Sequence, residues 1–119
     1  MKHSEIQASC PMDALLRIIS GPWTSYIIWI LTNHGSVRFG ELKRLVPGIS
    51  SRLLTDRLRK LEEAGLVTRD YKPTIPPEVS YSLTDRGLQL RSVMVTLSEL
   101  AFEWDLAVGC EDGCGPAEA

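Results

Sequence analysis

Residues 51–64 carry the most regular pattern in the sequence, and few folds accommodate it. At about 100° per residue, the leucines of this segment fall on one side of a helix, at Leu54, Leu58 and Leu61. The opposite side is polar and partly basic, with Arg52, Thr55, Asp56, Arg59 and Glu63. Ser50 or Ser51 is a suitable N-cap, and Gly65 follows the last turn. We therefore expect a helix that packs its leucines on a core and leaves a polar face uncovered.

A shorter helix is predicted immediately before this one. Residues 40–46 have leucines three positions apart, and Pro47 and Gly48 stop the helix. Two helices joined by such a turn form a helix-turn-helix unit. Further upstream, residues 23–33 are apolar nearly all round, which predicts a central buried helix. A short strand is expected between these elements, over residues 37–39.

Beyond residue 64 the pattern changes to strands. Residues 66–72 and 79–83 are rich in Val, Thr and Tyr, and the proline-rich segment between them predicts a hairpin loop. A final helix over residues 85–108, capped by Thr84, carries apolar residues on more than one face. The expected fold class is α+β, mainly α with a small β-hairpin. Its order of elements is that of a winged helix-turn-helix with N- and C-terminal dimerisation helices.

Length and composition predict a single domain. The chain has 119 residues, of which 44% are hydrophobic and 24% charged, so it is neither disordered nor fibrous. We place the domain at residues 10–108, between an N-terminal arm over 1–9 and a flexible acidic tail over 109–119. The longest apolar run, residues 26–31, is far too short to span a membrane. The first residues lack the apolar stretch of a signal peptide, so we expect a cytoplasmic protein without membrane contact.

Basic residues are concentrated in the middle of the chain. Residues 38–72 carry nine basic and five acidic side chains, whereas residues 73–119 carry two basic and eight acidic ones. A basic segment within a chain of net charge −2 favours a local anionic partner. The alternative interpretation is a helix packed in an ordinary globular domain whose charges are merely solvated.

Double-stranded DNA is the anionic partner that suits this arrangement. In a helix-turn-helix the second helix enters the major groove, so its exposed residues must donate and accept hydrogen bonds. Arg52 and Arg59 can fork onto guanine or clamp a phosphate, and Asp56 can accept from cytosine or hold an arginine in its rotamer. The hairpin would lie against the backbone or the minor groove. The predicted DNA-binding residues are Arg38, Ser50, Ser51, Arg52, Thr55, Asp56, Arg59, Lys60, Arg69, Lys72 and Thr74.

Several short motifs together resemble the HxlR family of winged-helix transcription regulators, which is related in architecture to the MarR group. The matching segments span residues 10–90 and comprise 10–11, 21–24, 37–42, 47–50, 54–62, 65–67, 76–84 and Gly87. The resemblance implies a homodimeric transcriptional regulator that binds DNA. Pro22 departs from the pattern, since many members have a basic residue before the tryptophan.

The last helix supplies an independent reason to expect a homodimer. It carries more apolar surface than one small core can cover, and large exposed patches mark interfaces. A two-fold axis would place two copies of the recognition helix about one DNA turn apart, on a pseudo-palindromic operator.

The three cysteines, Cys10, Cys110 and Cys114, suggest redox sensing. Cys10 precedes Pro11 at a helix start, where free N–H groups and the helix dipole stabilise a thiolate and raise its reactivity. The family resemblance implies the same role, because several members sense oxidants or electrophiles with a cysteine at this position. Cys110 and Cys114 could resolve an oxidised Cys10, pair with each other, or bind a metal with Cys10 and a histidine. The alternative is that Cys10 is simply a small, half-buried residue.

Other functions fit the sequence less well. His3 and His34 belong to no pattern of paired nucleophile and base, so we expect no enzyme and no cofactor. A winged helix used only for protein contacts is the main alternative to DNA binding. A small-molecule effector could bind near the aromatic residues Trp23, Tyr26, Trp29 and Trp104, which are more often core.

Overall fold

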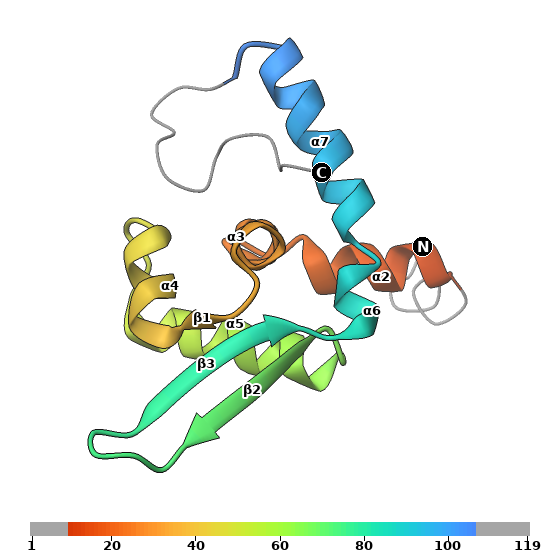
Figure 1. Ribbon diagram of the computed structural model, residues 1–119. Coiled ribbons are helices and arrows are strands. Elements are labelled where there is room, and N and C mark those ends of the chain that lie inside the picture. Colours follow the sequence, from red (N-terminus) through yellow and green to blue (C-terminus); the bar gives the residue numbers. More distant parts are fainter. Residues whose placement is uncertain (1–9, 107–119) are drawn as a thin grey trace.

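The computed structural model describes residues 10–106, and Figure 1 shows how their elements are arranged. The helices are α2 (Pro11–Ile19), α3 (Thr24–His34), α4 (Phe39–Leu45), α5 (Ser51–Glu63), α6 (Asp85–Leu88) and α7 (Arg91–Glu103). The strands are β1 (Val37–Arg38), β2 (Val67–Lys72) and β3 (Glu78–Leu83). The hairpin of β2 and β3, here called the wing, projects at one end of the molecule, and α7 projects at the other (Figure 1). The predicted α+β class and the predicted order of elements are confirmed.

The central helix α3 forms the middle of the hydrophobic core, as its apolar sequence predicts. It packs against α2, α4, α7 and β3, and its fully buried residues include Ile27, Ile28, Ile30 and Leu31. The helix begins one residue later than predicted. Trp23 adopts a left-handed φ of 71°, which is not helical, so Thr24 is the first residue of α3. Gly35, with φ 78°, ends the helix.

A tight turn joins α4 to α5. Gly48 lies in this turn with φ 89°, a conformation that favours glycine. Ser50, rather than Ser51, caps α5: its Oγ accepts a hydrogen bond from the backbone N–H of Leu53 at 3.0 Å. The predicted leucine face is confirmed, because the residues of α5 that are buried in the core are Leu54, Leu58 and Leu61.

The wing belongs to a three-stranded antiparallel sheet with strand order β1-β3-β2. The sequence predicted a separate short strand and a hairpin; the structure joins them through pairing of Val37 with Tyr81 and of Arg38 with Ser80. Tyr81 also pairs with Arg69 of β2 and is buried. This pairing places Arg38, which precedes α4, directly beside the wing.

The prediction of one continuous helix over residues 85–108 is wrong. The chain forms α6, breaks, and continues as α7, which ends at Glu103. At the break, the N–H groups of Gln89 and Leu90 bond to carbonyls three residues back, at 3.2 and 3.0 Å, instead of four. Asp105 then adopts φ 60°, which is incompatible with a continuing helix.

The physical reason for the break lies in the contact between α6 and the start of the wing. Thr84 N–H donates to the carbonyl of Leu66 at 2.9 Å, and a Cβ on Gly87 would lie 2.2 Å from the same oxygen. This close approach fixes α6 against the wing. The α7 helix packs instead on α3. The tightened turn at residues 89–90 therefore changes the direction of the chain, so that α6 packs on the wing and α7 on α3.

Two elements leave apolar side chains uncovered. No residue of α2 is buried, and the exposed apolar residues of α2 and α7 are Met12, Leu15, Leu16, Ile18, Val93, Leu97 and Phe102. Within residues 10–106, no single helix has the length and apolar character needed to cross a membrane. The pair α2 and α3 reaches that length and composition together but is bent by 80°.

Candidate nucleic-acid interface

The outward face of α5 is an open polar ridge. Ser51, Arg52, Thr55 and Arg59 are exposed on it, because the leucines on the other side hold the helix to the core. A shallow hollow of about 550 Å³ follows this face. Its lining consists of Ser51, Arg52, Thr55, Asp56 and Arg59, all of which belong to the predicted DNA-binding set. Side chains that can donate and accept hydrogen bonds are therefore available to a partner.

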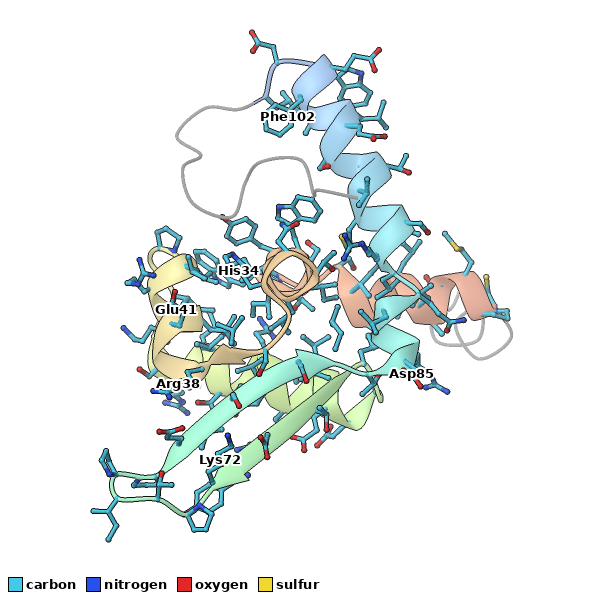
Figure 2. All side chains as sticks on the ribbon, in the orientation of Figure 1. His34, Arg38, Glu41, Lys72, Asp85 and Phe102 are labelled. Atoms are coloured by element: carbon cyan, nitrogen blue, oxygen red, sulfur yellow. The ribbon has the colours of Figure 1, made fainter. Side chains whose placement is uncertain are left out.

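A larger groove separates α5 from the wing. It has a volume of about 720 Å³ and is open to solvent. Four predicted residues from separate parts of the chain line it, namely Arg38, Thr55, Arg59 and Arg69, together with the carboxylates Glu62 and Glu78. Figure 2 shows Arg38 at the start of α4, on the side of the molecule from which the wing and Lys72 extend. The β1–β3 pairing brings Arg38 to the wing, and the packing of α5 on β2 brings Thr55 and Arg59 to it. Periodicity within one helix could not reveal this arrangement.

The charges on this surface differ in their partners. Arg38 forms an ion pair with Glu78 at 3.2 Å. Asp56 pairs with Lys60 at 3.5 Å and with Arg57 at 3.4 Å. Arg52 and Arg59 have neither an ion pair nor a hydrogen bond from their side chains within residues 10–106. These two guanidinium groups are therefore the most available donors on the α5 face.

Four of the predicted residues line neither hollow, namely Ser50, Lys60, Lys72 and Thr74. Ser50 uses its hydroxyl oxygen as the α5 cap. Lys72 and Thr74 are exposed towards the tip of the wing, where the Thr74 hydroxyl donates to the carbonyl of Pro76 at 2.7 Å. Arg69, which does line the groove, makes a cation–π contact: its guanidinium lies 5.6 Å from the centroid of the Tyr71 ring.

Sequence reasoning missed one side chain that positions α5. The Nε of Arg57 donates to the backbone carbonyl of Pro22 at 3.1 Å, across 35 positions of sequence. Its Nη1 also meets Asp56, so this is the arginine that Asp56 holds in place. Trp23, the next residue of the junction between α2 and α3, lies 3.7 Å from where a Cβ of Gly48 would be. The junction thus contacts both α5 and the turn before it.

Cys10 lies at the predicted helix start. It is the N-cap of α2, is half-buried, and its Sγ accepts from the N–H of Asp13 at 3.5 Å. Cys110 and Cys114 lie outside the described residues. Within residues 10–106, no three His, Cys, Asp or Glu side chains are grouped so that they could hold a metal ion.

The aromatic residues considered for an effector pocket differ in burial. Trp29 belongs to the core and Tyr26 packs against it, whereas Trp23 and Trp104 are exposed. His34 is the last residue of α3 and points to solvent, which agrees with a role in ending the helix.

Comparison with known proteins yields consistent matches. A family model described as HxlR-like helix-turn-helix matches residues 18–107. The HTH-type transcriptional regulator YvaP of Bacillus subtilis is 39% identical over 105 residues, which cover 87% of this chain and 94% of that protein. An HTH-type transcriptional regulator of Methanothermobacter thermautotrophicus is 38% identical over 100 residues, which cover 84% of this chain and 72% of that protein.

Solved structures resemble the chain equally well. A MarR-family transcriptional regulator from Porphyromonas gingivalis superimposes with a TM-score of 0.75 at 37% identity, covering 80% of this chain and 92% of that one. The redox regulator HypR in its oxidized form superimposes with a TM-score of 0.73 at 35% identity, covering 79% of this chain and 96% of that one. The reduced form of the transcriptional regulator YodB from B. subtilis superimposes with a TM-score of 0.68 at 31% identity, covering 80% of this chain and 93% of that one.

Proposed function

Because the chain belongs to the HxlR-like helix-turn-helix family, and is thus a DNA-binding transcriptional regulator and not an enzyme, we propose that it acts as a homodimer on a pseudo-palindromic operator. The observation that carries this proposal is the exposed α5 face, on which Arg52 and Arg59 have no partner within the described residues. A function on DNA would place the protein in the cytoplasm.

In this proposal α5 lies in the major groove. Arg52 and Arg59 fork onto guanine or bind phosphate, and Thr55 between them contacts either a base or the backbone. Asp56 is held by Lys60 and Arg57, which supports a positioning role for it rather than a direct contact with cytosine. The surrounding residues contact the backbone; they are Arg38, Ser50, Ser51, Lys60, Arg69, Lys72 and Thr74.

The homodimer is supported by the uncovered apolar side chains of α2 and α7. A monomer would leave these residues in water, whereas a second copy would cover them with the same residues related by a two-fold axis. The wing and α7 lie at opposite ends of the molecule (Figure 1), so pairing through α7 leaves both wings free for DNA.

A redox response through Cys10 is the second part of the proposal. The thiol lies at the N-terminus of α2, where its Sγ accepts a hydrogen bond from the N–H of Asp13 at 3.5 Å. HypR, a redox regulator, and YodB are similar in fold and sequence. A peroxide would oxidise the Cys10 thiol to a sulfenic acid and be reduced to an alcohol or water, and a second thiol, on Cys110 or Cys114, would then displace water to form a disulfide. Pairing of Cys110 with Cys114 and a non-covalent effector are the alternatives.

DNA binding is tested by electrophoretic mobility shift on the DNA upstream of the chain's own gene. The affinity should fall steeply as salt rises from about 50 to 200 mM, because each phosphate contact releases counterions. Arg52→Ala or Arg59→Ala should cost roughly 1–3 kcal/mol of binding free energy if the residue reads a base.

The matched control is Arg44→Ala, which removes an exposed arginine of α4 that pairs with Glu41 of the same helix. This variant should bind as the wild type does. The alternative, a winged helix used only for protein contacts, would be favoured by a DNA affinity that does not depend on salt, or by equal losses of DNA affinity in all three arginine variants.

The redox proposal is tested separately by reducing and non-reducing gels after mild oxidant treatment. We expect a crosslink or an internal disulfide that requires Cys10, and Cys10→Ser should bind DNA while no longer responding to oxidant. An unchanged response in Cys10→Ser would eliminate Cys10 as the sensor and leave the DNA-binding proposal intact.

A further inference from the structure

The groove between α5 and the wing gathers three guanidinium groups from three elements. Arg38 comes from β1, Arg59 from α5 and Arg69 from β2. Arginine is well suited to bind phosphate because its planar fork of N–H donors matches the phosphate oxygens. The groove also contains the carboxylates of Glu62 and Glu78. The charge of the groove is therefore mixed. Of the two carboxylates, Glu78 is the one paired with an arginine of the groove within residues 10–106.

One of the three arginines is already occupied. Arg38 and Glu78 are 3.2 Å apart, with side chains 68% and 36% exposed. An ion pair this accessible to water contributes little to stability, but while it is formed the charge of Arg38 is neutralised by Glu78. Within residues 10–106, neither Arg59 nor Arg69 has a carboxylate partner. Among the described residues, Arg59 and Arg69 thus have no carboxylate to displace, although the Arg69 guanidinium contacts the Tyr71 ring. The third arginine, Arg38, is held by Glu78 of the wing.

We propose that this groove binds the sugar–phosphate backbone of the DNA strand beside α5, and that Glu78 limits the groove to two net phosphate contacts by holding Arg38. This inference rests on the proposed DNA binding and concerns its strength. If Arg38 left Glu78 for a phosphate, the Glu78 carboxylate would stand uncompensated beside the DNA, where it repels the phosphates. Arg38 therefore adds little net counterion release while Glu78 is charged.

The experiment is a fluorescence anisotropy titration of the full chain with a mixed-sequence duplex of about 30 bp, about three helical turns. Glu78→Gln keeps the size of the side chain and removes its charge. The slope of log K against log salt should become steeper by about 0.9 for each bound copy of the chain, because Arg38 now neutralises one more phosphate. The affinity at about 0.1 M salt should rise roughly three- to tenfold.

The matched control is Glu41→Gln. Glu41 also holds an exposed arginine, Arg44, at 2.6 Å, but it lies outside the groove. This variant changes the net charge equally and should leave the slope unchanged. Combining Arg38→Gln with Glu78→Gln should return the slope to the wild-type value. An equal gain in Glu41→Gln would assign the effect to net charge and overturn the inference, as would an unchanged slope in Glu78→Gln.

Two further measurements keep the outcomes distinct. Circular dichroism and the thermal midpoint Tm of Glu78→Gln should match the wild type; if they do not, Glu78→Ser repeats the test with a side chain that cannot hold an arginine. A wild-type chain that shows no salt-dependent DNA affinity would contradict the proposed function itself. Normal wild-type binding with no effect of Glu78 would contradict this inference alone.

Discussion

Gly87 shows how strongly a single position can be constrained by the tertiary structure. A Cβ there would lie 2.2 Å from the carbonyl oxygen of Leu66 and 3.0 Å from Cδ2 of Leu83. The oxygen belongs to the backbone, so it cannot move aside as a flexible side chain would. Nothing in the local sequence marks Gly87 as different from another helical glycine, because the atom that excludes a side chain lies 21 positions earlier.

We predict that Gly87→Ala lowers the free energy of unfolding by about 1–3 kcal/mol or more, since the wing and α6 must separate to admit the methyl group. The control is Gly40→Ala, because a Cβ on Gly40 meets no atom within 4 Å. In α4 this change should be neutral or stabilise by about 0.5–1 kcal/mol. Urea unfolding measures both, and similar midpoints for the two variants would contradict the prediction.

At the scale of elements, the sequence predicted the two faces of α5 correctly but did not predict the contact that orients this helix. Its faces follow from leucine spacing alone, because every residue that defines them lies within one helix. Its orientation does not. The bond from Arg57 to the carbonyl of Pro22 joins α5 to the junction between α2 and α3. A sequence pattern cannot identify such a contact, since a backbone carbonyl has no residue-specific signature.

We predict that Arg57→Met weakens DNA recognition through the angle of α5. The side chain is 19% exposed and its bond to Pro22 is charge-assisted, so the free energy of unfolding should fall by about 1–2 kcal/mol. Affinity for the chain's own upstream DNA should fall by more than affinity for a mixed-sequence duplex, because a tilted α5 still meets phosphates but misplaces Arg52 and Arg59.

Arg44→Met removes a comparable cation from α4 without breaking a contact between elements. It should change neither affinity. Fluorescence anisotropy with the two duplexes makes the comparison, and equal losses on both duplexes in Arg57→Met would show that Arg57 contributes charge and not position.

The break between α6 and α7 is also a matter of elements. The apolar stripes of residues 85–108 run on without interruption, and they predict one helix. Tertiary contacts divide it, since α6 is fixed to Leu66 and α7 to α3. Most of residues 85–103 are helical, as the pattern predicts, but the pattern was wrong about the continuity of the helix and about its end, which lies at Glu103.

At the scale of the whole molecule, the surface is divided between two ends. Figure 2 shows Lys72 and Arg38 towards the wing and Phe102 near the far end of α7. The basic residues that line the groove lie at the wing end, and the uncovered apolar residues of α7 lie away from it. A regulator that pairs through one end and binds DNA with the other can dimerise without covering its recognition helices.

We predict that Leu97→Asp disrupts the homodimer. Leu97 is 54% exposed on α7, and a charge there would have to be buried without a partner in a dimer interface. Sedimentation equilibrium should show a monomer. Affinity for the upstream DNA should fall by more than tenfold, because each half-site would then be bound independently.

Ser92→Asp is the control for the same helix. Ser92 is exposed in the first turn of α7, where an acidic side chain is compatible with the helix dipole. This variant should remain a dimer with normal affinity. A wild-type chain that sediments as a monomer while binding its operator tightly would contradict the dimer proposal.

The sequence by itself determined the order of helices and strands, the leucine face of α5, the helix start at Pro11 and the basic composition of the middle segment. Each depends on residues close together in the chain, where spacing and local hydrogen bonding suffice. Only the tertiary structure decided which charges meet. Pairing of β1 with β3 brought Arg38 to Glu78, and packing of α5 brought Arg59 to Arg69 across a groove. Such neighbours are set by long-range pairing, which local periodicity does not encode.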